Sequence, residues 1–298
     1  MPSLKEVRNR INSVRSTQQI TKAMKMVAAA KLRRAQDAII QMRPYSRQLQ
    51  EVLSHIMESA YAEEELIGPF FETRPVERVL IVCITSDRGL CGSFNSNVIK
   101  ACNTLINEKY AKQHRAGRVA LMPIGKKGRD FFKRKNVPLI EDFTELFAKL
   151  SFDKVRPAAE FVMNQFANKK YDVVELVYNE FKNVATQIVR VVPYLPLQLP
   201  AEETKEKRAI VADFIYEPDK TSIIAELLPK TLKIQFYKTL LESNAAEHGA
   251  RMTAMDKATE NAGELLKQLR LIYNRTRQDA ITKEILEIVG GAEALTKG

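Results

Sequence analysis

The sequence predicts an α/β domain combined with a long antiparallel coiled coil built from both ends of the chain. Two observations support this fold class. Both ends are long stretches with helical apolar spacing and almost no proline or glycine, and the middle alternates β-rich apolar runs with helical segments. We therefore expect a first long helix at 1–60, a central α/β domain at 74–217 and a second long helix at 230–296.

The first helix is predicted from an uninterrupted stretch between Ser3 and Arg43 that lacks proline and glycine. Ser3 is the expected N-cap and Glu6 completes a capping box. The pattern continues past Pro44 to about Ser59, which gives a helix of roughly 85 Å at 1.5 Å per residue.

The apolar residues at the start of this helix step by three and four, the spacing of a coiled-coil seam. We expect the stripe then to change register, as a nearly straight helix requires. Its members are Leu4, Val7, Ile11 and Val14, followed after the change by Ile20, Met24, Val27 and Ala28 and then by Ala35, Ile39 and Met42.

The second helix is predicted over Lys230–Val289, and Gly290-Gly291 should end it. Neither long helix is apolar all round, so each needs the other. Small residues on both would let the two backbones approach closely: Ala28, Ala29 and Ala30 on the first, and Ala245, Ala246, Ala250 and Ala254 on the second.

The middle of the chain predicts a mainly parallel sheet, because strands and helices alternate there. The expected helices are 96–113, a short one within 125–135, and 153–168. The expected strands are 79–84, 118–124, 171–178, 187–192 and 210–216. The last strands follow one another without a helix, so that edge should be antiparallel. The prolines Pro193, Pro196 and Pro200, with Glu202–Arg208 after them, indicate an exposed loop.

The net charge of +11 is concentrated at the start of the chain. Residues 1–36 carry nine Lys or Arg side chains and one Glu, a net charge of +8. Such a segment favours an acidic partner, either a nucleic acid or an acidic protein cavity. The basic residues are Lys5, Arg8, Arg10, Arg15, Lys22, Lys25, Lys31, Arg33 and Arg34.

Motifs for catalysis, a metal or a cofactor are not recognisable in the sequence. Asp87–Gly92 and Gly125–Gly128 follow strands but lack the spacing of dinucleotide or phosphate loops, so we expect tight turns. Cys91 has no legible catalytic histidine among His55, His114 and His248. The carboxylates of Asp256, Glu260, Glu264, Glu284 and Glu287 are interpreted as a solvated helix face.

Four stretches, in this order, resemble the γ subunit family of F-type rotary ATP synthases. They are Ile11–Ala28 (INSVRSTQQITKAMKMVA), Ser86–Asn95 (SDRGLCGSFN), Glu247–Ala262 (EHGARMTAM and ATENA) and Ile281–Ala294 (ITKEILEIVGGAEA). The resemblance implies a central rotor shaft with a Rossmann-like foot domain and no active site, catalytic residue, metal or cofactor of its own.

The implied partners are the α and β subunits of the catalytic head, the ε subunit and the c-subunit ring, with no nucleic acid. Contact with the membrane would be through the c ring only, on the cytoplasmic side of a bacterial plasma membrane. The start of the chain has no apolar leader region and no window approaches the roughly 20 apolar residues of a membrane span. Cys83, Cys91 and Cys102 are expected to be reduced thiols.

The resemblance also implies positions for contact or coupling with the β subunits. Met24 would face their acidic loops, with Lys25 and Arg33 in the same basic stretch. Arg277 and Gln278 would contact a β-subunit catch loop. Arg251, Thr282 and Glu284 match positions that tune coupling through helix packing. A nucleic-acid-binding protein with a coiled-coil arm and a stand-alone nucleotide-dependent enzyme are the alternatives.

Overall fold

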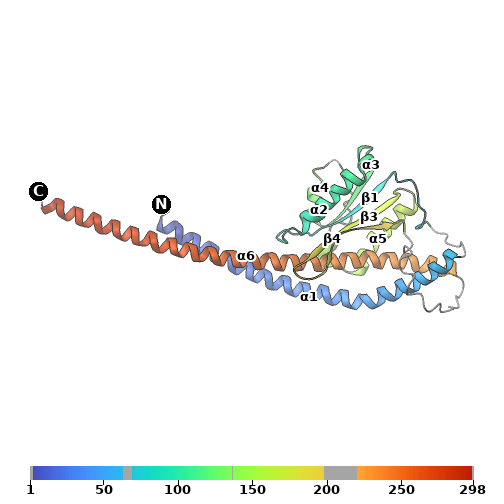
Figure 1. Cartoon of the computed structure of the whole chain (residues 1–298), viewed down its shortest axis with the longest axis horizontal. Helices are drawn as coiled ribbons and strands as arrows, with labels where there is room; N and C mark the ends of the chain where they lie inside the picture. The colour runs from blue at the N-terminus through green and yellow to red at the C-terminus, as the bar shows by residue number, and fades with distance from the viewer. Residues whose placement is uncertain (1–2, 63–68, 136, 198–219, 297–298) are drawn as a thin grey trace. The chain divides into compact units, whose positions relative to one another are not determined.

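The computed structural model describes residues 3–62, 69–135, 137–197 and 220–296 (Figure 1). One long helix comes first in the sequence and another comes last, with four strands and several shorter helices between them. In chain order the elements are α1 (Leu4–Ala62), β1 (Val79–Ile84), α2 (Phe94–Thr104), the π-helix η1 (Leu105–Lys109), α3 (Ala111–Arg115), β2 (Val119–Ile124), α4 (Lys126–Phe132), the 3₁₀ helix η2 (Leu146–Lys149), α5 (Phe152–Ala167), β3 (Val173–Phe181), β4 (Gln187–Leu195) and α6 (Lys220–Thr296). The predicted fold class is confirmed.

The chain divides into two compact units, which are described separately. One unit, called here the coiled-coil unit, consists of residues 1–28 and 251–298. The other, called the α/β unit, consists of residues 29–250. The division into 1–60, 74–217 and 230–296 expected from the sequence follows secondary-structure elements and stays a prediction.

The sheet of the α/β unit has the strand order β2-β1-β3-β4. Strands β2, β1 and β3 are parallel, and β4 pairs with β3 in the antiparallel sense, as predicted. All six side chains of β1 are fully buried, which is typical of a central parallel strand covered on both faces. The predicted strand 210–216 lies outside the described residues.

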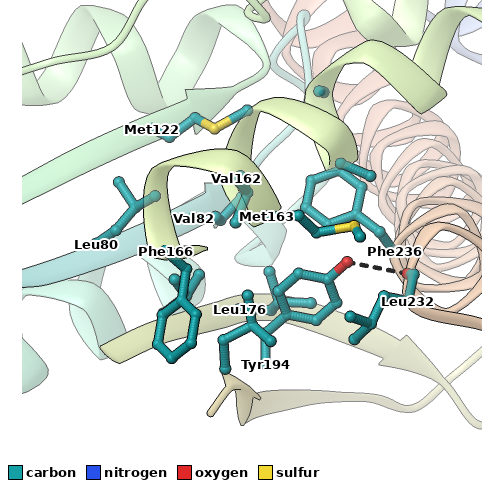
Figure 2. Packing of buried hydrophobic residues seen from close by; sticks show 14 of the residues in the cluster. Leu80, Val82, Met122, Val162, Met163, Phe166, Leu176, Tyr194, Leu232 and Phe236 are labelled. Carbon is teal, nitrogen blue, oxygen red and sulfur yellow. Dashed lines mark hydrogen bonds between the residues drawn. The ribbon is translucent and has the colours of Figure 1, made fainter. Parts of the chain in front are cut away.

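Each face of the sheet is covered by a different set of helices. On one face α5 and the first part of α6 pack against the strands in a core that includes Phe166, Tyr194 and Phe236 (Figure 2). The Tyr194 hydroxyl, fully buried there, donates a hydrogen bond of 3.0 Å to the Leu232 carbonyl oxygen. On the other face α2 and η1 cover β1 and β2 through Val98, Cys102 and Ile106.

Several element boundaries differ from the prediction. Helix α6 begins at Lys220 and contains Pro229, and it runs through Gly290-Gly291 to Thr296 instead of ending there. Strand β4 runs through Pro193 to Leu195, because an edge strand with a register shift opposite Val174/Glu175 tolerates a residue without an amide proton. The predicted helix at 96–113 begins at Phe94 and gives way to the π-helix η1.

The predicted N-cap of α1 is present. The Glu6 amide donates to Ser3 Oγ at 3.2 Å, and the Val7 amide donates to the Ser3 carbonyl at 3.1 Å. The Ser3 hydroxyl therefore satisfies an amide of the first turn that has no partner inside the helix, and its carbonyl accepts the first intrahelical bond.

Candidate functional site

The edge of the sheet where ligands usually bind in α/β proteins lies at the carboxyl ends of β1, β2 and β3. In this chain the first amides of α4 are already occupied there. The Lys126 amide donates to Asp87 Oδ1 at 3.1 Å, the Lys127 amide to the Ser86 carbonyl at 3.1 Å and the Gly128 amide to Thr85 Oγ1 at 2.8 Å. The Asp87 carboxylate thus stands at the helix end where a phosphate would otherwise bind.

The two glycine-containing loops at this edge are turns, as predicted. Gly125 has a φ of +99°, and a Cβ there would lie 2.1 Å from the Thr85 carbonyl oxygen, so only glycine fits between β2 and α4. Leu90, in the loop after β1, also has a positive φ of 65°, and its side chain is exposed.

Helix α6 packs against the segment that follows β1 and against the end of β3. Ala246 and Ala250 pack against Cys91, Phe94 and Phe181 in one buried cluster. Gly249 lies so close that a Cβ there would approach Phe181 Cε2 to 3.2 Å. A small-residue face of α6 therefore occupies the switch point at which parallel sheets usually bind nucleotides.

Cys91 is a structural side chain in this cluster. It is 1% exposed, it accepts a hydrogen bond of 3.2 Å from Asn95 Nδ2, and it lies 3.7 Å from Ser86 Oγ. Cys83 and Cys102 are also buried as free thiols, and burial, with the adjacent Cys83 thiol, holds the pKa of Cys102 well above its ordinary value. Within the described ranges no group of His, Cys, Asp and Glu side chains could hold a metal ion.

The coiled-coil unit pairs α1 and α6 in the antiparallel sense. Gln18 Nε2 donates to the Thr259 carbonyl at 3.4 Å, the Thr21 and Thr259 hydroxyls are 2.8 Å apart, and Lys25 Nζ lies 2.5 Å from Asp256 Oδ1. Residues later in α1 thus meet residues earlier in α6. Continuing this pairing to Leu4 reaches about residue 277 of α6.

The predicted register change in the α1 stripe is wrong. Ile20 and Val27 are 59% and 57% exposed, whereas Thr21 and Ala28 are 8% and 2% exposed. The three-and-four spacing of Leu4, Val7, Ile11 and Val14 continues unchanged, so that Gln18, Thr21 and Lys25 occupy the next seam positions. Polar side chains that bond across the seam, and not a shift of the apolar stripe, explain the gap in the apolar pattern.

The basic residues of α1 lie on its outer surface. Eight of the nine found in residues 1–36 are exposed, and the ninth, Lys25, is half-buried. Lys25 is paired with Asp256, and the other eight form no ion pair with any residue that the structure describes. Asp256 is therefore not simply part of a solvated face, as the sequence suggested.

The end of α6 exposes large apolar side chains. Ile281, Ile285 and Ile288 are 47%, 54% and 71% exposed, and Leu286 and Val289 are 65% and 51% exposed. They lie beyond about residue 277, where the pairing with α1 runs out, and Figure 1 shows the C-terminal end of α6 continuing past the first turn of α1. Arg277, Gln278, Thr282 and Glu284 are exposed in the same stretch.

The remaining predicted site residues are spread along the two helices. Met24 and Arg251 are half-buried in the coiled-coil unit, and Arg33 is exposed on the part of α1 that belongs to the α/β unit. The sequence prediction missed Gln18, Thr21 and Thr259. Their seam spacing was a signal for them, because 18, 21 and 25 continue the series from Leu4.

Comparison with known proteins decides the family. The family model described as ATP synthase matches residues 3–295. The ATP synthase gamma chain of Cytophaga hutchinsonii is 58% identical over 99% of both chains, and that of Amoebophilus asiaticus is 50% identical over the full length of both. The chain belongs to the ATP synthase gamma chain family.

Solved structures agree with this assignment. The chain is similar, at 27% identity and a TM-score of 0.58, to a chain of the Tetrahymena thermophila mitochondrial ATP synthase central stalk and c-ring, covering 80% of this chain and 99% of that one. A chain of the Euglena gracilis enzyme, 21% identical, has the same fold with a TM-score of 0.66 over 98% of this chain and 94% of that one. The identification made from the four sequence stretches, and the role in ATP synthase that it implied, are confirmed. No helix among the described residues has an apolar window long enough to cross a membrane.

Proposed function

We propose that this chain is the non-catalytic central shaft of its ATP synthase, and that it converts rotation of the c ring into conformational cycling of the catalytic β subunits. The observation that carries the proposal is the outer face of α1, where eight exposed basic side chains have no ion pair within the described chain. The ε subunit and the c ring are the proposed partners of the α/β unit, in keeping with the central stalk and c-ring named for the Tetrahymena relative.

The basic face of α1 is suited to contact with a partner surface that the shaft passes repeatedly as it rotates. Coulomb attraction between Lys or Arg and acidic loops falls off slowly with distance and does not require one fixed geometry. A rotating shaft must meet each of several equivalent acidic loops in turn, so orientation-tolerant attraction is appropriate there. We assign this attraction to Arg33, and we propose that Met24 faces the same acidic loops without contributing a charge. Lys25, which is paired with Asp256, acts mainly between the helices.

The apolar end of α6 supplies a second contact. Five large apolar side chains between Ile281 and Val289 are 47% to 71% exposed. A contiguous apolar surface of this kind indicates a protein partner. We propose that it lies in the cavity of the catalytic head, where Arg277 and Gln278 contact a catch loop and Thr282 and Glu284 adjust the coupling.

The lack of catalysis is supported by the filled edge of the sheet. The α4 amides are bonded to Thr85, Ser86 and Asp87, and Ala246 and Ala250 pack against Cys91, Phe94 and Phe181 beside the ends of β1 and β3. A nucleotide would have to displace a carboxylate and a packed helix, so we propose that nucleotide chemistry belongs to the partner subunits.

Asymmetry between the two helices explains how rotation could select β-subunit states. Residues 1–28 carry six Lys or Arg and one Glu, whereas residues 251–298 carry eight Lys or Arg and seven acids, so the net charges are +5 and +1. Each β subunit would meet a different face at each step. Different contacts with open and closed β states shift their populations, and so the shaft acts as a moving allosteric effector.

We further propose that the chain lies at the cytoplasmic side of a bacterial plasma membrane and reaches the membrane only through the c ring. The bacterial relatives and the lack of a membrane-spanning helix in the described residues support this location.

Co-purification with tagged α and β subunits tests the shaft assignment. We expect a complex that hydrolyses ATP, and no hydrolysis by the isolated chain. Failure to assemble with the αβ hexamer would reject the assignment. Tight, steeply salt-dependent binding to duplex DNA or RNA would instead favour the nucleic-acid alternative.

A further inference from the structure

The seam between α1 and α6 in the coiled-coil unit contains a cluster of polar side chains at its centre. Thr21 is 8% exposed, and it is the one buried α1 side chain between Val7 and Ala28. Gln18, Thr21 and Lys25 hold three consecutive seam positions, and Thr259 and Asp256 face them from α6. We call these five residues the polar layer.

The two threonine hydroxyls form a directional link across the seam. Their oxygens are 2.8 Å apart, the Thr21 hydroxyl lies 3.0 Å from the Gln18 carbonyl, and the Thr259 hydroxyl lies 2.7 Å from the Met255 carbonyl. Each hydroxyl has a single proton, so one hydroxyl donates to the other and the second donates to its own helix. A shift of either helix would break the bond between the two hydroxyls and leave each threonine bonded only to its own helix.

Gln18 and Lys25 extend the link on either side. Gln18 Nε2 reaches the Thr259 carbonyl at 3.4 Å, and a Cβ on Gly263 would lie only 3.1 Å from that nitrogen. Gly263 therefore leaves room for the Gln18 amide. On the other side Lys25 and Asp256 form a half-exposed ion pair.

Of the buried apolar side chains around the polar layer, Met255 and Leu266 are large, but two others are too small to define the register. Ala28 and Ala262 are two of the buried neighbours, and alanine offers almost no knob to lock into a hole on the facing helix. A polar residue at a coiled-coil seam specifies register, because any shift leaves a buried polar atom without its partner.

We propose that the polar layer fixes the axial register of α1 against α6, and thereby fixes which side chains of the shaft face the β subunits together. This inference deepens the proposed function and rests on it only for the consequence in coupling. The register itself is a property of the chain and can be measured separately.

Distances between spin labels on the two helices test the register. Labels on Arg15→Cys and Lys267→Cys, both exposed positions, can be measured in the assembled complex by pulsed electron resonance. The three native cysteines are at most 1% exposed and should remain unlabelled in the folded chain. A slip of one helical turn changes the separation along the axis by about 5.4 Å.

The test variant replaces both threonines by the isosteric valine and removes the ion pair: Thr21→Val, Thr259→Val, Lys25→Ala and Asp256→Ala. We expect a broadened or shifted distance distribution in place of one narrow peak. Exchange of the charges alone, Lys25→Asp with Asp256→Lys, should preserve the narrow peak. A narrow, unshifted peak in the fourfold variant would overturn the proposal, because neither the threonine link nor the ion pair would then be needed to set the register.

Matched controls separate register from general helix stability. Thr17→Val removes a hydroxyl that bonds at 2.9 Å to the Ser13 carbonyl of its own helix, and Glu226→Ala with Lys230→Ala removes an ion pair within α6. Both controls should keep the narrow peak, and broadening by either would overturn the assignment to the polar layer.

Protons pumped per ATP hydrolysed in reconstituted vesicles then test the link to function independently. A fall in this ratio of about twofold or more, together with a shifted distance, supports the consequence for coupling. A shifted distance with an unchanged ratio would uphold the register but contradict the proposed role of the shaft faces.

Discussion

The α/β unit and the coiled-coil unit stabilise themselves in different ways. Strand β1 contributes six fully buried apolar side chains to the first, and large rings such as Phe132, Phe166 and Phe236 are fully buried around it. The described part of the coiled-coil unit buries few side chains, among them Val7, Leu266 and Leu269, and places polar residues at its seam. The difference indicates that the α/β unit is specified by burial, and the coiled-coil unit by directional bonds and by its partners.

This contrast predicts a division of mutational effects. Substitutions in the α/β core should lower the free energy of unfolding, whereas substitutions on the coiled-coil surface should change coupling and leave stability unchanged.

The largest effect is expected for Phe236→Ala. The ring is fully buried with its centroid 5.7 Å from that of Tyr194, so truncation should reduce the free energy of unfolding by about 3–5 kcal/mol. Urea denaturation followed by circular dichroism measures this change. Leu271→Ala, at a side chain that is 71% exposed, should change stability by less than about 0.5 kcal/mol. Equal losses in the two variants would contradict the contrast.

Arg277→Ala should lower the rate of ATP synthesis without lowering the stability of the fold. The side chain is exposed, so we expect the free energy of unfolding to change by less than about 0.5 kcal/mol. Loss of its proposed contact should lower the rate of ATP synthesis in reconstituted vesicles about tenfold, equivalent to about 1.4 kcal/mol. Arg270→Ala removes the same charge from an exposed position on the same helix and should have a smaller effect. Full synthesis rates with Arg277→Ala would show that the assigned contact is wrong.

Gly263→Ala tests whether the Gln18 side chain packs over Gly263 in the seam. Alanine favours the helix by about 0.8–1 kcal/mol relative to glycine, but its Cβ would crowd Gln18 Nε2 at 3.1 Å. The gain in stability should therefore be smaller in the natural chain than in a Gln18→Ala background, by about 0.5 kcal/mol. Thermal unfolding of the four chains in a double-mutant cycle gives this difference. The same gain in both backgrounds would mean that Gln18 does not occupy the space over Gly263.

The smallest effect concerns a carboxylate within the α/β unit. Burial, and to a smaller extent Glu180, raise the pKa of Glu242 above 4.5, although Lys238, Arg43 and a hydrogen bond with Tyr178 act in the opposite direction. The folded chain then holds this proton more tightly than the unfolded chain does. Its contribution to stability is greatest below pH 4.5 and is lost as the pH rises through the folded-state pKa.

Glu242→Gln should remove this pH dependence. The free energy of unfolding of the natural chain should fall, relative to that of the variant, as the pH rises above 4.5. Urea denaturation at several pH values provides the comparison. Parallel curves for the two chains would exclude a raised pKa at Glu242.

Local signals in the sequence predicted most of the fold. The β-branched run of β1 and the proline-poor ends identified a central strand and two long helices, and Ser3 with Glu6 located the first N-cap. Pro193 and Pro229 misplaced two boundaries. The rules that exclude proline from strands and helices do not hold at a sheet edge with a register shift, or where surrounding contacts stabilise the helix.

The site was less predictable, because it depends on which residues of two distant segments face each other. Following only the apolar residues passed over Thr21 and produced the false register change, although Thr21 continues the three-and-four series and is buried. The pairing of Lys25 with Asp256 joins residues that are 231 positions apart and has no local signal. The exposed residues around Arg277 could be singled out only by resemblance, since an exposed helix face looks the same with or without a partner.

The polar layer also restricts how the length of this chain can change. A seven-residue insertion between Thr21 and Ala28, or between Arg251 and Thr259, would keep the three-and-four spacing, but it would move Thr21 away from Thr259 by about 10.5 Å. A shorter insertion would also rotate the apolar side chains out of the seam. Differences in length between related chains should therefore accumulate in the connections of the α/β unit, and the paired segments should evolve by substitution alone.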